Sequence, residues 1–457
     1  MNMINKLVLK VLAIVVFCQP VMSAAEPTSQ EQQYREQLEE LAQAYQSVYG
    51  FSGSIKVVKG GQSLAESSYG LADRSFNIDN AIDYRFSINS ISKTFTAAAV
   101  MQLVESGEIS LDQSVGAYLP ELNADWKDEV TVHHLLTHSS GLPRESGIQW
   151  YDEFTLEQQV VNLINKQTLL FAPGTRYEYS NSGITLLGRI IETVSGQSFS
   201  NYINNQIIKP LELTNTGVYE GRKLVKKQAV PYRITTNGVA SAQRAKHLGQ
   251  NAGGGMYSTV NDLYQFVVAL ENNRLFSAET TQLMFKPQIQ IDGGDAASYG
   301  WTLKPFGDKT LVFASGSGYG TKSVMVREST SGDFIAVTSN WGNTPILQLM
   351  AGLFLIINDL DYDLPDQKAL AQPNDYVEFL GTYRFDPTLL KKHLMTDSDS
   401  MTLQEIDGRL FLNDELLADK ENGFLGLTYT DEVMIKVDDT SMTININGNQ
   451  VIGKRQD

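Results

Sequence analysis

The chain divides into segments because its hydrophobic and polar positions follow different periods along its length. Apolar positions at helical spacing predict an amphipathic helix over residues 31–49. Two β-type runs then predict strands over 51–58 and 63–69, joined by a turn at Gly60 and Gly61. The apolar stretch from Thr94 to Glu105 predicts a helix that ends at Gly107.

Helical spacing dominates the middle of the chain, and strands return near residue 299. We expect helices over 132–137, 156–165, 184–194 and 260–270, and strands over 299–304, 310–313, 322–327 and 334–338. A further helix is expected over 346–357. The order predicts an α/β (α+β) domain whose sheet is assembled from both ends, with a helical region inserted between them.

A domain boundary is predicted at 364–374, where Pro365, Asp366, Pro373 and Asn374 break the periodic pattern. Beyond it, short β-type runs over 401–406, 409–412, 433–437 and 442–446 accompany Asp-Gly and Asn-Gly turns at 407–408 and 447–448. These runs predict a small all-β domain, a sandwich or a barrel, over residues 374–457. The preceding domain is placed at 26–364.

Residues 1–25 are typical of a secretory signal peptide. Lys6 and Lys10 form a positive start, an apolar run extends from Val11 to Cys18, and small residues follow at 23–25. The apolar run is far shorter than the ~20 residues that span a bilayer. We therefore expect an exported protein, periplasmic or secreted, without a stable membrane span.

Charge and cysteine content exclude several classes of partner and chemistry. The formal net charge is −16, and removal of Lys6 and Lys10 brings it to about −18. So acidic a chain repels phosphate backbones, and we expect no nucleic-acid partner. The single cysteine, Cys18, lies in the predicted signal, so the mature chain would have neither a disulfide nor a thiolate nucleophile. The oligomeric state is not readable from the sequence.

The spacing of Ser90 and Lys93 is the first candidate for chemistry. On a helix, positions i and i+3 share a face, and a helix N-terminus offers N–H groups to a developing oxyanion. A serine hydroxyl needs a base to become a nucleophile, and a buried or crowded lysine can serve as that base. Alone the spacing is weak, because a helix start with Ser90 as its N-cap gives the same pattern.

Two later segments carry polar groups that fit the same chemistry. Tyr179 precedes Ser180 and Asn181; a tyrosine can relay protons to a leaving group, and an asparagine can orient a substrate amide. The segment from Ala314 to Gly320 is rich in glycine at the end of a predicted strand, where an exposed N–H can complete an oxyanion hole. A helix cap with a packed tyrosine explains the first segment equally well, and a glycine-rich turn without a function explains the second.

Taken in order, Ser-x-x-Lys, Tyr-x-Asn and a small-residue strand motif resemble the serine β-lactamase and penicillin-binding-protein superfamily. The chain is similar to its class C-like branch, which also holds D,D-peptidases, D-amino-acid peptidases and esterases. The similarity covers roughly residues 51–357 and includes six further segments: Arg85–Ser87, Thr94–Ala97, Leu135–Pro143, Pro173–Gly174, Gly253–Ser258 and Tyr299–Trp301.

The resemblance implies a β-lactamase-like antiparallel sheet flanked by helices. It also implies a role for each candidate residue of the three motifs. Ser90 would be acylated, Lys93 would be its base or would tune Tyr179, and Tyr179 would move protons in acylation and deacylation. The backbone N–H groups of Ser90 and Ser317 would form the oxyanion hole. The substrate-binding and oxyanion residues implied in this way are Asn181, Ser315, Gly316 and Ser317.

No metal and no cofactor is implied, and the expected partner is a small-molecule or peptide substrate. One position departs from the family pattern: relatives usually carry Lys or His where this chain has Ala314. That position often contacts a substrate carboxylate or supports the tyrosine. Acid substrates such as penicillins are therefore less expected, and an ester or a small peptide or amide is the leading expectation.

Three other kinds of site are disfavoured. His134 and His138 stand at i, i+4, but no glutamate lies between them, so we interpret them as loop anchors and not as zinc ligands. The sequence has no Gly-x-Ser-x-Gly nucleophile elbow. The segment Gly316 to Gly320 lacks the spacing of a dinucleotide-binding loop.

A function of a different class remains open at this point, a catalytically silent homologue that binds a ligand or a protein partner. Fold alone does not fix function. The presence of Ser90, Lys93, Tyr179 and Asn181 together favours an enzyme, because an idle site has no physical need for all four.

Overall fold

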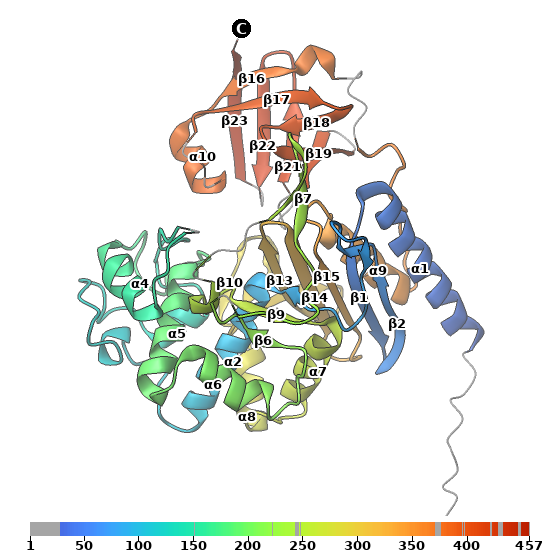
Figure 1. Cartoon of the computed structure of the whole chain (residues 1–457). Coiled ribbons are helices and arrows are strands. Elements are labelled where there is room, and N and C mark those ends of the chain that lie inside the picture. Colours follow the sequence, from blue (N-terminus) through green and yellow to red (C-terminus); the bar gives the residue numbers. More distant parts are fainter. Residues whose placement is uncertain are drawn as a thin grey trace, which may run out of the picture.

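The computed structural model shows a larger domain built on a sheet, the sheet domain, and a smaller barrel domain (Figure 1). It describes residues 28–149, 151–221, 223–242, 246, 248–370, 376–394, 396, 398–420, 423–427, 433–446 and 449–456. The predicted signal peptide, Pro373 and Asn374 of the predicted boundary, and the turn at Asn447 and Gly448 lie outside these residues. Within the described ranges, no helix combines the length and the apolar character needed to cross a membrane.

An antiparallel sheet forms the centre of the sheet domain. In the described part of the chain it has eight strands, in the spatial order β10 (Ile289–Gln290), β11 (Ala296–Ala297), β12 (Thr302–Phe306), β13 (Lys309–Gly318), β14 (Thr321–Glu328), β15 (Phe334–Ser339), β1 (Gly53–Lys59) and β2 (Gln62–Tyr69). Strand β1 pairs with β15 from Gly53 opposite Ser339 to Val58 opposite Phe334. The prediction that both ends of the domain build one sheet is therefore confirmed.

Helices cover both faces of the sheet (Figure 1). On one face, α1 (Ser29–Tyr49) and α9 (Ile346–Ile357) pack on β1, β14 and β15 and form a separate hydrophobic core. Helix α1 begins with a capping box, in which the Thr28 hydroxyl accepts the N–H of Glu31 at 3.2 Å. Its predicted apolar stripe is buried against α9 and the sheet, from Leu38 to Val48.

The inserted helical region lies against the other face and contains the main core. Its helices are α2 (Ser92–Glu105), α3 (Val132–Leu136), α4 (Leu156–Asn162), α5 (Asn181–Ser195), α6 (Phe199–Ile203), α7 (Val260–Glu271) and α8 (Ala278–Phe285). Short strands connect this region to the sheet: β3 (Leu71–Asp73), β4 (Ile78–Asp79), β5 (Phe86–Ser87), β6 (Gly217–Val218) and β9 (Met256–Ser258).

Two strand boundaries lie clearly away from the predicted positions, whereas the other predicted boundaries in the sheet differ by at most two residues. The pattern predicts a strand that stops at Phe313, but β13 continues through the glycine-rich segment to Gly318, opposite Thr321 of β14. Cross-strand hydrogen bonds hold this segment extended in spite of its glycines. Strand β12 begins at Thr302 and not at Tyr299, because Gly300 turns the chain with a φ of 85°.

The barrel domain confirms the prediction of a small all-β domain and is a closed barrel, not a sandwich. Within the described ranges its strands are β16 (Gly381–Arg384), β17 (Ser400–Ile406), β18 (Arg409–Leu412), β19 (Glu415–Lys420), β20 (Gly423–Gly426), β21 (Val433–Val437), β22 (Ser441–Ile446) and β23 (Asn449–Gln456), with helix α10 (Pro387–Leu394) between the first two. The sequence pattern misses β16, β19, β20, β23 and α10, since they are short or lack a clear alternation.

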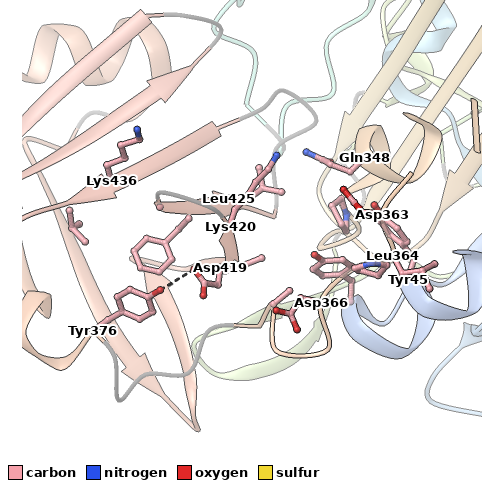
Figure 2. A pocket seen from close by; sticks show the side chains of 18 of the residues that line it. Tyr45, Gln348, Asp363, Leu364, Asp366, Tyr376, Asp419, Lys420, Leu425 and Lys436 are labelled. Atoms are coloured by element: carbon pink, nitrogen blue, oxygen red, sulfur yellow. Dashed lines mark hydrogen bonds between the residues drawn. The ribbon is translucent and has the colours of Figure 1, made fainter. Parts of the chain in front are cut away.

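The barrel packs on the sheet domain beside a hairpin formed by β7 (Tyr232–Thr235) and β8 (Gly238–Ser241), which reaches toward β18 and β19 (Figure 1). Tyr232, Ile234 and Trp341 share a hydrophobic cluster with Phe411 and Leu425 of the barrel. A cavity of 920 Å³ opens beside this interface and is lined by residues of α1, α9 and the barrel (Figure 2). No serine, histidine or cysteine stands among the described residues that line it.

Candidate active site

The turn that carries Ser90 is a short 3-10 helix, η1 (Asn89–Ile91), that leads directly into α2. Asn89 has a φ of 47°, and its side-chain amide donates to the hydroxyl of Thr321 on β14 at 3.1 Å. Helix α2 is held from behind, since Phe95 stacks on Phe266 of α7 with ring centroids 3.9 Å apart. The turn is therefore fixed between the sheet and the main core.

Lys93 is buried one turn along the same helical path, as its i+3 spacing predicts. Its Nζ donates to Ser90 Oγ at 3.0 Å and to the carbonyl oxygen of Gly253 at 2.7 Å. A Cβ on Gly253 would lie 3.1 Å from Nζ, so a side chain at this position would crowd the amine. The first two of the three consecutive glycines, Gly253 and Gly254, line the cavity described below.

Tyr179 reaches the same hydroxyl from the other side. Its phenol donates to Ser90 Oγ at 2.9 Å. Lys93 Nζ and the guanidinium of Arg144 each lie 5.0 Å from the centroid of its ring. Ser90 Oγ therefore has two groups that can exchange a proton with it within 3.0 Å.

The backbone that carries Tyr179 is anchored by its neighbours. Ser180 caps α5 by accepting the N–H of Gly183 at 3.1 Å, and Asn181 is the first residue of the helix. The N–H of Ser180 donates to Nδ1 of His138 at 3.2 Å, and the His138 ring packs 4.6 Å from the Tyr179 ring. His138 thus anchors the loop that carries Tyr179.

His138 is held in its neutral form by its surroundings. Burial, together with the nearby cations Lys93 and Arg144, lowers the pKa of His138 to about 3. A neutral ring can accept the Ser180 N–H through Nδ1 and adds no positive charge beside Lys93. Because His138 stays neutral, it does not exchange protons with the groups around Ser90.

Asn181 lines a cavity of 720 Å³ that opens over Ser90. Its amide donates to Oε1 of Glu145 at 2.8 Å. Among the described residues that line this cavity, Glu145 is the only one with a charged side chain. Glu145 could not be predicted from the sequence, because no local pattern marks a carboxylate that reaches the site from a loop.

Strand β13 brings the glycine-rich segment against the nucleophile turn. A Cβ on Gly316 would lie 2.3 Å from the carbonyl oxygen of Ile88 and 2.7 Å from the nitrogen of Ser90. Ser317 is exposed and lines the cavity, whereas Ser315 is half-buried opposite Val324. Gly316 and Ser317 therefore lie beside Ser90. Ser315 is the preceding residue of β13 and is not among the described residues that line the cavity.

Ala314 packs against the main hydrophobic core, so the position where relatives usually carry Lys or His is apolar here. The two histidines considered for zinc have other partners: His134 Nδ1 accepts the N–H of Thr131, and His138 Nδ1 accepts the N–H of Ser180. The adjoining His133 has its Nδ1 2.8 Å from the hydroxyl of Tyr299. In the described part of the chain, no three His, Cys, Asp or Glu side chains form a group that could hold a metal ion.

The family model described as Beta-lactamase matches residues 38–351, which include Ser90, Lys93, Tyr179 and strand β13. The chain belongs to the Beta-lactamase family. Within this family it is similar to PbpX of Bacillus subtilis (strain 168), with 30% identity over 56% of this chain. That match covers 62% of the length of PbpX, less than two thirds. Penicillin-binding protein 4* of the same organism is 25% identical over 86% of this chain and 92% of its own.

Several solved structures share the fold of this chain. A penicillin-binding protein from Bacillus halodurans is 26% identical, with a TM-score of 0.62 over 70% of this chain and 99% of its own. A D-stereospecific amidohydrolase from Streptomyces sp. is 25% identical, with a TM-score of 0.58 over 69% and 95%. The octameric penicillin-binding protein homologue from Pyrococcus abyssi matches 91% of this chain and 95% of its own, at 24% identity and a TM-score of 0.65. The family match and the amidohydrolase support a hydrolase in general terms, whereas the octameric homologue shows the fold alone.

Proposed function

We propose that this member of the Beta-lactamase family is a serine hydrolase that acts through an acyl-enzyme on Ser90. The observation that carries the proposal is the position of Ser90 Oγ at the wall of a 720 Å³ cavity, 3.0 Å from Lys93 Nζ and 2.9 Å from the hydroxyl of Tyr179. A hydroxyl with two proton-exchanging partners in hydrogen-bond range has the geometry of an activated nucleophile.

In the acylation step, Ser90 Oγ attacks the carbonyl carbon of the substrate and its proton passes to Lys93 or Tyr179. The carbonyl oxygen becomes negatively charged and accepts hydrogen bonds from the backbone N–H groups of Ser90 and Ser317. The close approach of Gly316 to the Ser90 nitrogen supports this pairing. When the carbonyl re-forms, the bond to the leaving amine or alcohol breaks, and the proton is returned to that leaving group.

In the deacylation step, water attacks the ester carbonyl of the acyl-enzyme and loses a proton to the same pair of groups. The tetrahedral intermediate uses the same two N–H groups. Its collapse breaks the bond to Ser90 Oγ, which recovers a proton, and the carboxylic acid product leaves. Every proton is exchanged between substrate, water, Ser90, Lys93 and Tyr179.

The charges around the cavity favour an amide, small peptide or ester whose acyl group carries no carboxylate. Ala314 leaves no cation at the position that often contacts such a group, and Glu145, which is ion-paired with Arg144 at 3.7 Å, presents a carboxylate to the cavity. An amino group near the scissile bond would pair with Glu145, which Asn181 holds in place at 2.8 Å. The relative named as a D-stereospecific amidohydrolase is in keeping with an amide substrate.

We further infer that the protein is exported, on the basis of its residues 1–25 alone. Mass spectrometry of the protein from culture fractions tests this inference. A mature N-terminus near Ala25 in the periplasm or medium agrees with it, and an intact Met1 in the cytoplasm contradicts it.

The proposed activity is tested by the intact mass of the protein after exposure to a fluorophosphonate and, separately, to a penicillin. Wild type should gain one fluorophosphonate adduct, Ser90→Ala should gain none, and the exposed-site control Ser75→Ala should behave as wild type. Labelling by the fluorophosphonate alone favours an amidase or esterase, whereas penicillin labelling points to cell-wall chemistry. A folded wild type that reacts with neither probe supports the silent, ligand-binding homologue and contradicts the proposal.

A further inference from the structure

The hairpin β7–β8 links the barrel domain to the cavity over Ser90. Its strand β7 contacts β19 of the barrel (Figure 1). Ser241, at the end of β8, lines the cavity. The hairpin also contacts the turn between β13 and β14: a Cβ on Gly320 would lie 2.8 Å from that of Ala242 and 3.1 Å from the nitrogen of Tyr232. A displacement of the hairpin would therefore displace the turn between β13 and β14, which follows Ser317.

On the barrel side, Asp414 holds the hairpin. This residue lies in the turn between β18 and β19, and its carboxylate forms an ion pair with the guanidinium of Arg233 on β7. The same carboxylate accepts the N–H of Thr236 at 2.8 Å and the hydroxyl of Thr236 at 3.1 Å. The Arg233 side chain is only 9% exposed, whereas the Asp414 side chain is 44% exposed, so the guanidinium is shielded from water while the carboxylate reaches solvent. The ion pair and the two hydrogen bonds to Thr236 together fix the direction of the Arg233 side chain.

On the cavity side, Arg233 supports Tyr319. The guanidinium carbon of Arg233 lies 4.3 Å from the centroid of the Tyr319 ring, which is a cation–π contact. Tyr319 follows Ser317 by two residues, and its side chain lines the cavity while 56% of its surface stays exposed. An exposed ring of this kind adopts one position only if a neighbour holds it there.

We propose that Asp414 of the barrel domain, acting through Arg233, positions Tyr319 as a specificity-determining wall of the active-site cavity. The inference rests on the proposed function of Ser90 and names a role for the barrel in it. The ring lies beside the strand that carries Ser317, so it meets the substituent of a substrate next to the reacting carbonyl. Held in place, its face favours a bulky apolar substituent over a small one.

The test compares the rates at which Ser90 is labelled by two fluorophosphonates, one with a methyl substituent and one with a phenylbutyl substituent, with kinact and KI determined separately. Wild type should favour the phenylbutyl probe. In Asp414→Asn the ratio of bulky to small labelling rates should fall about 3- to 10-fold, mainly through KI. Tyr319→Ala should lower the ratio by a similar factor, and Asp414→Asn should then have no further effect in the Tyr319→Ala background.

Asp407→Asn is the matched control, since Asp407 is an exposed aspartate in the neighbouring turn of the same barrel. It should keep the wild-type ratio. The inference is overturned if Asp414→Asn leaves the ratio unchanged, if it slows both probes by one common factor, or if its effect and that of Tyr319→Ala multiply. A wild type that neither probe labels at Ser90 contradicts the proposed function itself, which separates that failure from failure of the positioning role.

Discussion

Gly316 passes so close to Ser90 that a methyl group on its Cα would lie 2.7 Å from the Ser90 backbone nitrogen. The glycine is thus required by the distance between a strand and the nucleophile turn, and its own backbone angle is not the cause. The same absent side chain would lie 2.3 Å from the carbonyl oxygen of Ile88, which no rotamer change can relieve.

Replacement of Gly316 by alanine should therefore push β13 away from the turn and widen the proposed oxyanion hole. A displacement of about 1 Å at a reacting centre costs on the order of 100-fold in rate. We expect the fluorophosphonate labelling rate of Gly316→Ala to fall by about that factor. Thr310→Ala, at the exposed far end of the same strand, is the control and should label at the wild-type rate. Wild-type labelling of Gly316→Ala would show that the two N–H groups do not act together.

His138 should make the protein less stable in mild acid. Its pKa is lowered to about 3 in the folded protein, whereas a histidine in the unfolded chain takes up a proton near pH 6.5. Between these values the unfolded state binds more protons, so the free energy of unfolding should decrease as the pH falls from about 6.5 toward 3, by at most about 1.4 kcal/mol per pH unit. Urea unfolding at a series of pH values measures this slope.

The matched variant for this measurement is His138→Asn. Position 138 has a φ of 55°, which asparagine tolerates, and an asparagine oxygen can still accept the Ser180 N–H. The variant should lose the part of the acid slope that comes from His138, even if it is less stable at neutral pH. An unchanged slope would assign the acid sensitivity to other groups.

Glu145 should discriminate between substrates with and without a free amino group. Removal of its charge in Glu145→Gln keeps an acceptor for the Asn181 amide but weakens the pairing with an ammonium group. Because the Glu145 side chain is 49% exposed, we expect a loss of only about fivefold in kcat/KM for an amino-acid amide. The N-acetylated amide should be hydrolysed at the same rate by wild type and variant, and Glu129→Gln on the exposed surface should affect neither substrate. Equal losses on both amides would refute the pairing.

The sequence predicts the parts of the site that depend on local spacing or on a known motif order. Ser90 and Lys93 follow from one turn of helix, and the large sheet follows from strands at both ends of the domain. Tyr179 stands 89 residues from Ser90, and only the resemblance to a family brings the two together before the structure is seen. The extent of β13 could not be predicted, because its glycines signal a turn until the partner strand β14 is known.

The other side chains around the site are placed by tertiary packing, which the periodic pattern of the sequence does not predict. Glu145 and Arg144 lie in a loop after Pro143, and nothing in their order shows that they face Asn181 and Tyr179. Arg233 and Asp414 are 181 residues apart and belong to different domains. Such pairs are set by how one domain packs on the other, which the sequence of either domain alone does not encode.

The pairing of β1 with β15 has a consequence for the order in which the protein becomes competent to react. Gly53 pairs with Ser339, so the sheet cannot close until nearly the whole sheet domain has left the ribosome. Ser90 and Lys93 are made early, but β13 beside them gains its final position only when this late pairing is complete. An immature chain therefore carries its nucleophile in an unassembled site, and reactivity arises together with the finished fold.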